Sequence, residues 1–274
     1  MSSITKTEPV SPSPASPAAG EPGDPDFMLS LARGLSVIRA FGEGRSRLSV
    51  AQVARATGIS RAAARRCLYT LSLLGYARSN ENGFELTPGV LALGQAYLDS
   101  AAIARVAQPV LERVSSELSE SCSMAVLDGD EIVYVARAAT RRILSVDLSV
   151  GSRLPTAWTS MGRVLLAFAD DAVRARVLAR VKLTRHTPHT ILDRNQLKAE
   201  LDRVSRQGYA LVDQELEIGL RSIAVPVRRD GVVVAAVNVG AHVSRVDPQV
   251  LRRECLPVLR KAAQDIAAVL SPGL

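Results

Sequence analysis

The residues best suited to bind a charged partner lie between positions 45 and 78. Arginine recurs there, and no acidic residue lies between Glu43 and Glu81. A solvated surface normally mixes both signs of charge. A stretch with only positive charge is typical of a surface that faces phosphates, and it therefore predicts nucleic-acid binding. The arginines concerned are Arg45, Arg47, Arg55, Arg61, Arg65, Arg66 and Arg78.

A helix that begins after Ser60 would carry the chemistry for reading bases. Its predicted buried stripe is Ala64, Cys67, Leu68, Leu71 and Leu74. Arginine can donate both hydrogen bonds of its fork to guanine, and a serine hydroxyl can reach a phosphate. The small residues 62–64 would let the helix approach DNA closely. The predicted contacts from this helix are Ser60, Arg61, Ala62, Arg65, Arg66 and Tyr69.

Three further arginines are candidate DNA contacts outside that helix. Arg45 and Arg47 precede a short helix and are suited to phosphates, and Arg78 precedes a turn and is suited to phosphate or the minor groove. An ordinary solvated position is the alternative for each of them.

The elements around these residues form a recognisable order. Helical spacing of apolar residues predicts a first helix near 31–41, and Ser49 and Ser60 are suited to cap helices over 50–57 and 61–74. Gly58 lies in the turn between the last two. Residues 76–79 and 84–87 flank Asn-Glu-Asn-Gly, which predicts a hairpin. Three helices and a hairpin indicate a winged helix-turn-helix over 27–88.

The rest of the chain divides into three further segments. Residues 1–26 are rich in Pro, Ser and Ala and are expected to be a disordered tail. Pro88 is suited to the start of an apolar connecting helix, 89–101. The apolar face of this helix should pack against another surface, most simply against the same helix of a partner chain, so we expect a dimer. The pattern over 102–274 predicts an α/β domain. Its predicted helices follow Pro109 and lie at 160–167, 171–181, 195–207 and 248–270. Its predicted strands lie at 124–127, 132–136, 143–148, 209–212, 222–227 and 232–239. Pro257 should interrupt the last helix near its start.

No catalytic arrangement stands out in this larger domain. His186 and His189 lie in a threonine-rich loop where Pro188 prevents regular helical spacing, so a metal role is not expected. Asp213, Glu215 and Glu217 could imitate an acid/base pair, but a loop role or the orientation of a ligand fits them better. The chain lacks a phosphate-binding loop and a nucleophile elbow. We therefore expect no enzyme, no metal and no cofactor.

Composition narrows the possible classes of protein. The 274 residues are 47% hydrophobic and 22% charged, which excludes collagen-like, coiled-coil and wholly disordered chains. Aromatic residues make up only 4%, which argues against a stacking platform for single strands. Three distant cysteines and the lack of a long apolar run favour the cytoplasm and no membrane association. Residues 27–88 carry a net charge of +6 in 62 residues, whereas the 173 residues of 102–274 carry +5.

Several separated motifs resemble IclR-type bacterial transcriptional regulators. Residues 30–41 (SLARGLSVIRAF), 58–66 (GISRAAARR) and 86–94 (LTPGVLALG) resemble the DNA-binding half of that family. Residues 151–155 (GSRLP), 159–167 (TSMGRVLLA) and 219–226 (GLRSIAVP) resemble its effector domain. Residues 58–66 and 159–167 are most similar to the branch that controls protocatechuate, 4-hydroxybenzoate and β-ketoadipate catabolism.

The resemblance implies an α+β protein with a GAF-like effector domain, which forms dimers or dimers of dimers and binds a small organic acid. Matching motif positions makes Ser160, Met161, Gly162, Asp213, Ser222, Asn238 and Gly240 candidate effector contacts. Packing of a tight helix start is the alternative role for residues 160–162. Trp158 could shape the pocket or belong to the core.

The sequence thus predicts a ligand-responsive transcription factor that binds promoter DNA and an aromatic or dicarboxylic acid. Two alternatives stay open. One is a small-molecule-binding enzyme with an appended basic domain, and the other is a DNA-binding protein without an effector. The sequence leaves the operator, the effector and the choice between activation and repression undetermined.

Overall fold

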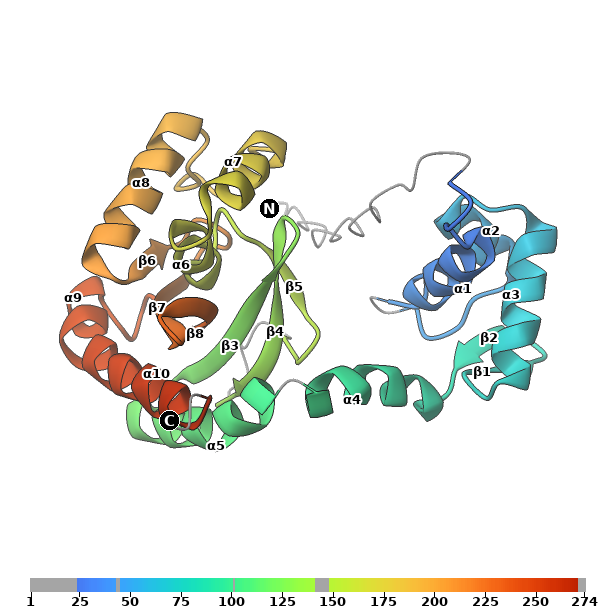
Figure 1. The fold of residues 1–274 in the computed structure, drawn as a ribbon, viewed down its shortest axis with the longest axis horizontal. Helices are drawn as coiled ribbons and strands as arrows, with labels where there is room; N and C mark the ends of the chain where they lie inside the picture. The colour runs from blue at the N-terminus through green and yellow to red at the C-terminus, as the bar shows by residue number, and fades with distance from the viewer. Residues whose placement is uncertain (1–23, 43–44, 101, 141–147, 271–274) are drawn as a thin grey trace, which may run out of the picture. The chain divides into compact units, whose positions relative to one another are not determined.

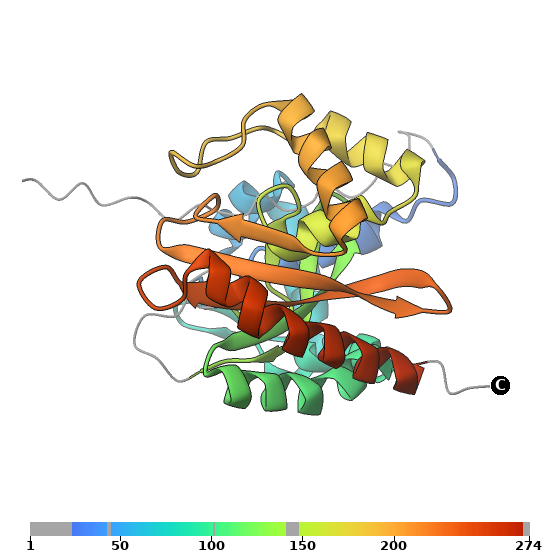
Figure 2. The ribbon, with the colours of Figure 1, turned by 90° about the vertical axis from the view of Figure 1, so that its left-hand side faces the viewer.

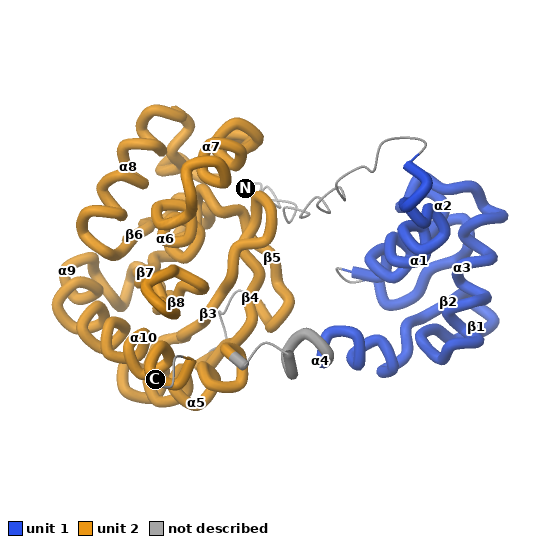
Figure 3. The backbone as a smooth tube through the Cα atoms, viewed as in Figure 1, with its two compact units in different colours: residues 1–97 blue, residues 98–274 orange. Residues whose placement is uncertain are grey.

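The computed structural model describes residues 24–42, 45–100, 102–140 and 148–270, without the side chains of 96–100 and 102. The chain divides into two compact units, 1–97 and 98–274 (Figure 3). The predicted tail, apart from residues 24–26, lies outside the described residues. The predicted strand over 143–148 does too, except for Leu148, which is not in a strand.

The first unit is a winged helix-turn-helix, as predicted. It contains α1 (Leu29–Arg39), α2 (Val50–Thr57) and α3 (Arg61–Leu73), followed by the hairpin β1 (Ala77–Asn80) and β2 (Gly83–Leu86). Ser49 and Gln52 form a capping box on α2, and the Ser60 hydroxyl caps α3. Gly58 ends α2 with a φ of +70°, a left-handed conformation in which glycine costs least.

The wing is anchored to the strand-like residue before α2. Leu48 and Phe84 exchange two backbone hydrogen bonds, each with an N–O distance of 2.9 Å. Gly83 allows this approach, because a Cβ there would lie 2.7 Å from the carbonyl oxygen of Leu48. Segments 45–49 and 83–86 are therefore fixed side by side.

The predicted stripe of α3 needs one correction. Ala64, Leu68 and Leu71 are buried in the core with Val37 and Val53, and Cys67 is half-buried. Leu74, however, follows the end of the helix and is 63% exposed. The backbone of Leu74 is still helical, but the chain changes direction at Gly75, which has a φ of +78°, and the Leu74 side chain stays outside the core.

The connecting region is helical, as predicted. A short 3-10 turn, Pro88–Val90, leads into α4 (Leu91–Ser100), and α5 (Ala102–Leu118) follows. The prediction that this second helix starts after Pro109 is wrong, since Pro109 lies inside α5. Proline removes the hydrogen bond to the carbonyl four residues earlier. That carbonyl belongs to Arg105, which is exposed, so water can satisfy it.

The second unit is built on one antiparallel sheet in the order β5-β4-β3-β8-β7-β6 (Figure 1). Its strands are β3 (Ser121–Asp128), β4 (Glu131–Ala138), β5 (Arg153–Pro155), β6 (Ala210–Asp213), β7 (Leu220–Arg229) and β8 (Val232–His242). The predicted strands at 124–127 and 132–136 pair as one antiparallel hairpin and those at 222–227 and 232–239 as another, and the structure adds β5, which is too short for alternation to reveal.

Helices cover both faces of this sheet (Figure 2). On one face lie α5 and α10 (Leu256–Leu270), whose apolar residues pack on Met124, Val225 and Val237. The other face is covered by α6 (Ser160–Ala167), α7 (Asp171–Arg180) and α8 (Arg194–Gln207), which pack on residues such as Ala224 and Ala236. This is the predicted GAF-like α/β arrangement, and the whole chain is α+β.

The last helix is interrupted as Pro257 predicts. A single turn, α9 (Pro248–Val250), is followed by a π-helical turn, Leu251–Cys255, and then by α10. A π-turn shifts the hydrogen-bond register, which suits a proline that cannot donate. No helix in the described part of the chain has the length and apolarity that crossing a membrane requires.

Candidate nucleic-acid interface and ligand site

Helix α3 presents the predicted face to solvent. Arg61, Ala62, Arg65 and Arg66 are exposed, and Tyr69 is 63% exposed. Ala63 and Ala64 are buried, so of the three small residues at 62–64 only Ala62 can approach DNA. The first two turns thus carry three guanidiniums around one small residue, which suits a helix that enters the major groove.

Ser60 already has a structural partner at the start of α3. Its hydroxyl oxygen accepts a hydrogen bond from the backbone N–H of Ala63 at 3.2 Å. Its hydroxyl hydrogen can still be donated. Ser60 can therefore cap the helix and bind a phosphate oxygen at the same time.

The wing contains a carboxylate that the sequence analysis did not consider. Glu85 of β2 lies opposite Arg78 of β1 and accepts hydrogen bonds from both Arg78 and Arg47. These contacts hold the pKa of the Glu85 carboxyl below its ordinary value, chiefly through Arg78. Counting residues across the predicted hairpin could have revealed the cross-strand pair. Arg45, two residues before Arg47 in the chain, is exposed.

A row of polar side chains crosses the middle of the sheet in the second unit, on the face that α6 covers. Strand register places Arg137 of β4 beside Ser123 of β3, and Ser123 beside Asn238 of β8. A second row places Gly240 between Ser121 and Ser222. We call these six residues the polar floor. Alternation fixes their face, because Ala125, Ala224 and Ala236, two residues from Ser123, Ser222 and Asn238, pack against α6.

Several buried polar atoms at the polar floor and α6 lack a partner. Arg137 donates from Nη1 to the Ser123 hydroxyl at 3.0 Å. Its Nε, the Oδ1 of Asn238 and the hydroxyl of Ser160 find no hydrogen-bond partner within the part of the chain that the structure describes. Leaving such a group unpaired costs about 1–3 kcal/mol, so these atoms indicate a site for a polar ligand or ordered water.

Gly240 leaves room in this site. A Cβ built on it would meet no heavy atom within 4 Å. The neighbouring floor residues Ser121 and Ser222 are small as well. Small residues beside unpaired donors and acceptors leave space that a small polar ligand can occupy.

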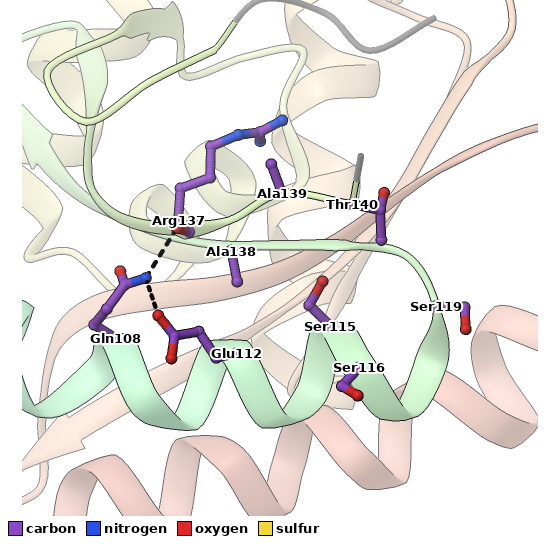
Figure 4. A pocket seen from close by; sticks show the side chains of 9 residues that line it. All are labelled: Gln108, Glu112, Ser115, Ser116, Ser119, Arg137, Ala138, Ala139 and Thr140. Atoms are coloured by element: carbon purple, nitrogen blue, oxygen red, sulfur yellow. Dashed lines mark hydrogen bonds between the residues drawn. The ribbon is translucent and has the colours of Figure 1, made fainter. Parts of the chain in front are cut away.

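Arg137 separates this site from a hollow on the other side of β4. That hollow, of about 550 Å³, lies between α5 and the end of β4. Figure 4 shows that the Arg137 side chain points away from Gln108 and Glu112. Only its carbonyl oxygen faces them, and it accepts a hydrogen bond from Gln108. The charge of Arg137 is thus directed to the polar floor. Sequence reasoning missed this residue, because nothing local distinguishes it from the other arginines.

Asp213, one of the predicted effector contacts, lies apart from the polar floor. It pairs across strands with Arg221, which alternation places on the face of α10. Arg221 donates to both carboxylate oxygens, at 2.9 and 2.8 Å, and also to the carbonyl of Val246. The structure therefore brings Ser222, Asn238 and Gly240 together and leaves Asp213 on the opposite face.

Met161 and Gly162 lie in the packed start of α6. Met161 is fully buried in the apolar cluster of that face. Gly162 passes so close to Thr156 that a Cβ would lie 2.3 Å from its carbonyl oxygen and 2.4 Å from its Cα. The sequence required a glycine here, but only the structure shows which backbone it faces.

The variant Gly162→Ala is expected to destabilise the second unit by about 1–3 kcal/mol, because α6 must move away from the Thr156 backbone. Chemical unfolding of Gly162→Ala and Gly240→Ala, followed by circular dichroism, tests this expectation. Both glycines are in the second unit, but a Cβ on Gly240 would meet nothing within 4 Å, and its backbone is not in the left-handed region. Equal stability of Gly162→Ala and the parent protein would contradict the packing role.

The other candidates for chemistry have structural partners. The His186 ring meets the Trp158 ring edge-on at 4.7 Å, and burial lowers the pKa of His186. Trp158 belongs to a buried cluster and donates to the carbonyl of Ile191. Among the residues described, no group of three or more His, Cys, Asp or Glu side chains could hold a metal ion.

Glu215 is committed to a buried ion pair instead of acid/base chemistry. Its carboxylate accepts from Arg163 Nη2 at 2.7 Å and from the backbone N–H of Ile191 at 3.2 Å. Arg163, only 1% exposed, also donates to the carbonyl of Ala157. The pair connects α6 to the loops around 191 and 215.

Comparisons with known proteins match both units of the chain. Residues 30–81 match the IclR helix-turn-helix domain, and residues 95–268 match the C-terminal domain of the bacterial transcriptional regulator IclR. The chain is 50% identical over 266 residues to the Pca regulon regulatory protein of Pseudomonas putida, covering 96% of this chain and 91% of that protein. It is 41% identical to the p-hydroxybenzoate hydroxylase transcriptional activator of Acinetobacter baylyi, covering 88% and 91%.

A solved structure extends the comparison to a bound ligand. An IclR homologue from Microbacterium hydrocarbonoxydans, complexed with 4-hydroxybenzoate, superimposes with a TM-score of 0.78 at 28% identity. The match covers 89% of this chain and all of that one.

Proposed function

Because the chain belongs to the IclR family of bacterial transcriptional regulators, we propose that it controls genes of aromatic acid catabolism in response to an acid bound on the polar floor. It is a DNA-binding regulator and not an enzyme. The observation that carries the effector site is the buried, unpaired Nε of Arg137, which faces the same side of the sheet as the unpaired Asn238 amide oxygen.

The polar floor fits one carboxylate and at least one hydroxyl. Arg137 would receive the carboxylate on Nε and Nη, as guanidinium forks do. Asn238 Oδ1 would accept from a ligand hydroxyl, and Ser160 could donate to or accept from one. Ser222 and Gly240 would border the ring. The relatives named for the Pca regulon and for p-hydroxybenzoate hydroxylase, and the 4-hydroxybenzoate complex, support an aromatic acid or a ring-cleavage product.

The remaining predicted contacts have supporting roles in this proposal. Met161 and Gly162 would shape the site by packing, and Asp213 would hold β6 and β7 together through Arg221. The functional effector contacts would then be Arg137, Ser160, Ser222, Asn238 and Gly240.

A thermal-shift screen tests the effector site. Protocatechuate, 4-hydroxybenzoate and β-ketoadipate would each be compared with benzamide, which has the ring but no carboxylate. A ligand that binds only the folded protein at about 100 times its Kd stabilises it by about 2.7 kcal/mol. If none of the acids raised the melting temperature above the benzamide control, the effector part of the proposal would fail.

The DNA contacts are proposed to come from α3 and the wing. Arg61, Arg65 and Arg66 would read guanines and phosphates, with Ser60, Ala62 and Tyr69 beside them. Arg45, Arg47 and Arg78 would contact phosphates or the minor groove. Their exposure and the absence of carboxylates over 45–80 support this assignment.

The double variant Arg61→Ala and Arg65→Ala is expected to weaken operator binding by about 2–6 kcal/mol, since each bidentate base contact is worth about 1–3 kcal/mol. Binding to a promoter fragment at physiological salt, measured by fluorescence anisotropy, checks it. Arg33→Ala with Arg39→Ala, on α1, is the charge-matched control. Unchanged affinity in a folded Arg61/Arg65 variant would remove α3 from the base-reading role.

Dimerisation is part of the same proposal. Leu91 and Leu93 of α4 are exposed in the single chain, as are Leu29, Leu31 and Leu35 of α1. Exposed apolar side chains that cluster on helices mark association sites. A homodimer, or a dimer of dimers, would cover them and present two recognition helices to a partly palindromic operator in the cytoplasm.

A further inference from the structure

One carboxylate of the wing, Glu85, binds two arginines: Arg78 of the same hairpin and Arg47 of the segment before α2. Arg47 Nη2 lies 3.3 Å from Oε2 of Glu85, and Arg78 donates from Nε to Oε1 of the same group. Each oxygen thus receives one guanidinium. The arginine side chains are 45% and 71% exposed, whereas that of Glu85 is 18% exposed. The acid lies between the two bases and is the most shielded of the three.

The backbone fixes this arrangement from two sides. Arg78 and Glu85 face each other in the β1–β2 register. Arg47 and Glu85 are the chain neighbours of Leu48 and Phe84, which pair through two hydrogen bonds. A carboxylate at position 85 therefore reaches both arginines without a change of the backbone.

Stability gives little reason for this pairing. Ion pairs at the surface contribute little to folding, because water screens them. The core of this unit is apolar and does not include Glu85. A carboxylate beside the two arginines also opposes their use on DNA, since phosphate oxygens and carboxylate oxygens compete for the same donors.

We propose that Glu85 acts as an internal substitute for phosphate, which occupies Arg47 and Arg78 and so lowers binding to DNA of arbitrary sequence. The inference rests on the proposed use of these two arginines on DNA. Binding without sequence preference depends on phosphate contacts alone, and each contact from the wing must displace Glu85. At the operator, base contacts from α3 compensate for that displacement. Glu85 is thus a specificity-determining residue.

The variant Glu85→Gln tests the proposal, with Glu81→Gln as its matched control. Both changes remove one negative charge from the same hairpin, but only Glu85 pairs with Arg47 and Arg78. The probe is a short duplex of arbitrary sequence, studied by fluorescence anisotropy over a series of salt concentrations. Glu85→Gln is expected to tighten binding by about 3- to 10-fold and to steepen the log–log salt dependence by about one. Glu81→Gln should change affinity by less than about 2-fold, because the charge is screened at a distance.

A second comparison introduces Glu85→Gln into a protein that already carries Arg47→Ala and Arg78→Ala, which completes a mutant cycle. There, Glu85→Gln should have no larger effect than Glu81→Gln. Equal effects of the two substitutions in the parent protein, or weaker binding by Glu85→Gln, would overturn the inference. So would tighter binding that persists without the arginines, since Glu85 would then repel DNA directly. If removal of both arginines from the Glu85→Gln protein leaves its DNA affinity unchanged, the proposed use of these two arginines on DNA fails instead.

Discussion

The variant Arg137→Met is expected to bind the acid effector at least about 30-fold more weakly than the parent protein, a loss of about 2–5 kcal/mol. Methionine keeps the length and volume of the side chain but offers no donor to a carboxylate. Arg137 Nε is buried and unpaired, whereas its Nη1 already donates to Ser123. A carboxylate would therefore gain a donor that has no other partner, and its removal would leave the ligand charge buried without a counter-ion.

Isothermal titration with the acid identified in the thermal-shift screen measures this loss. Arg137→Lys should lie between the parent and Arg137→Met, because it keeps the charge but not the fork. Arg176→Met, on the exposed side of α7, is the matched control and should bind normally. DNA binding of Arg137→Met without ligand should also be normal. An unchanged isotherm for a folded Arg137→Met protein would place the carboxylate elsewhere.

The variant Glu215→Gln is expected to lower the free energy of unfolding of the second unit by about 3–5 kcal/mol. Arg163 would remain 1% exposed with no counter-ion at 2.7 Å. Glu200 lies 3.9 Å away and is already shared with Arg203, so it can replace Glu215 only in part. The loop around 191 would also lose a charged acceptor for its backbone N–H.

Urea unfolding followed by tryptophan fluorescence reports on this unit alone, because Trp158 is the single tryptophan of the chain. Glu217→Gln is the matched control, since Glu217 is exposed two residues further along. The double variant Arg163→Met with Glu215→Leu should regain most of the lost stability, as apolar replacements of buried pairs do. A Glu215→Gln protein as stable as Glu217→Gln would mean that the buried pair is not coupled to folding.

Local sequence signals predicted the first unit well. Caps at Ser49 and Ser60, the turn at Gly58 and the hairpin after Asn80 act over a few residues, and the structure shows each of them. The contacts of Arg47 with Glu85 could not be predicted in this way. They depend on the pairing of Leu48 with Phe84, which joins segments 36 residues apart.

The ligand site was predicted less completely, for a comparable reason. Ser222, Asn238 and Gly240 were found by motif position, and strand register does bring them together. Asp213 was selected in the same way, but its side chain lies on the opposite face of the sheet. Successive residues of a strand point to opposite faces of the sheet, so a shift of one position moves a side chain to the other face. A β-bulge in β4, before Arg137, makes such a shift and thereby determines the face on which Arg137 lies.

The sequence by itself determined that this protein has a winged helix-turn-helix, an α/β second unit and a concentration of positive charge on the first. These properties follow from periodicity, capping and composition, which depend only on residues close together in the sequence. Only the tertiary structure decided which polar side chains meet on the sheet, that Arg163 and Glu215 are buried together, and that Glu85 of the wing binds both Arg47 and Arg78. Such contacts join residues far apart in the chain, and their free energy exists only once the strands have paired.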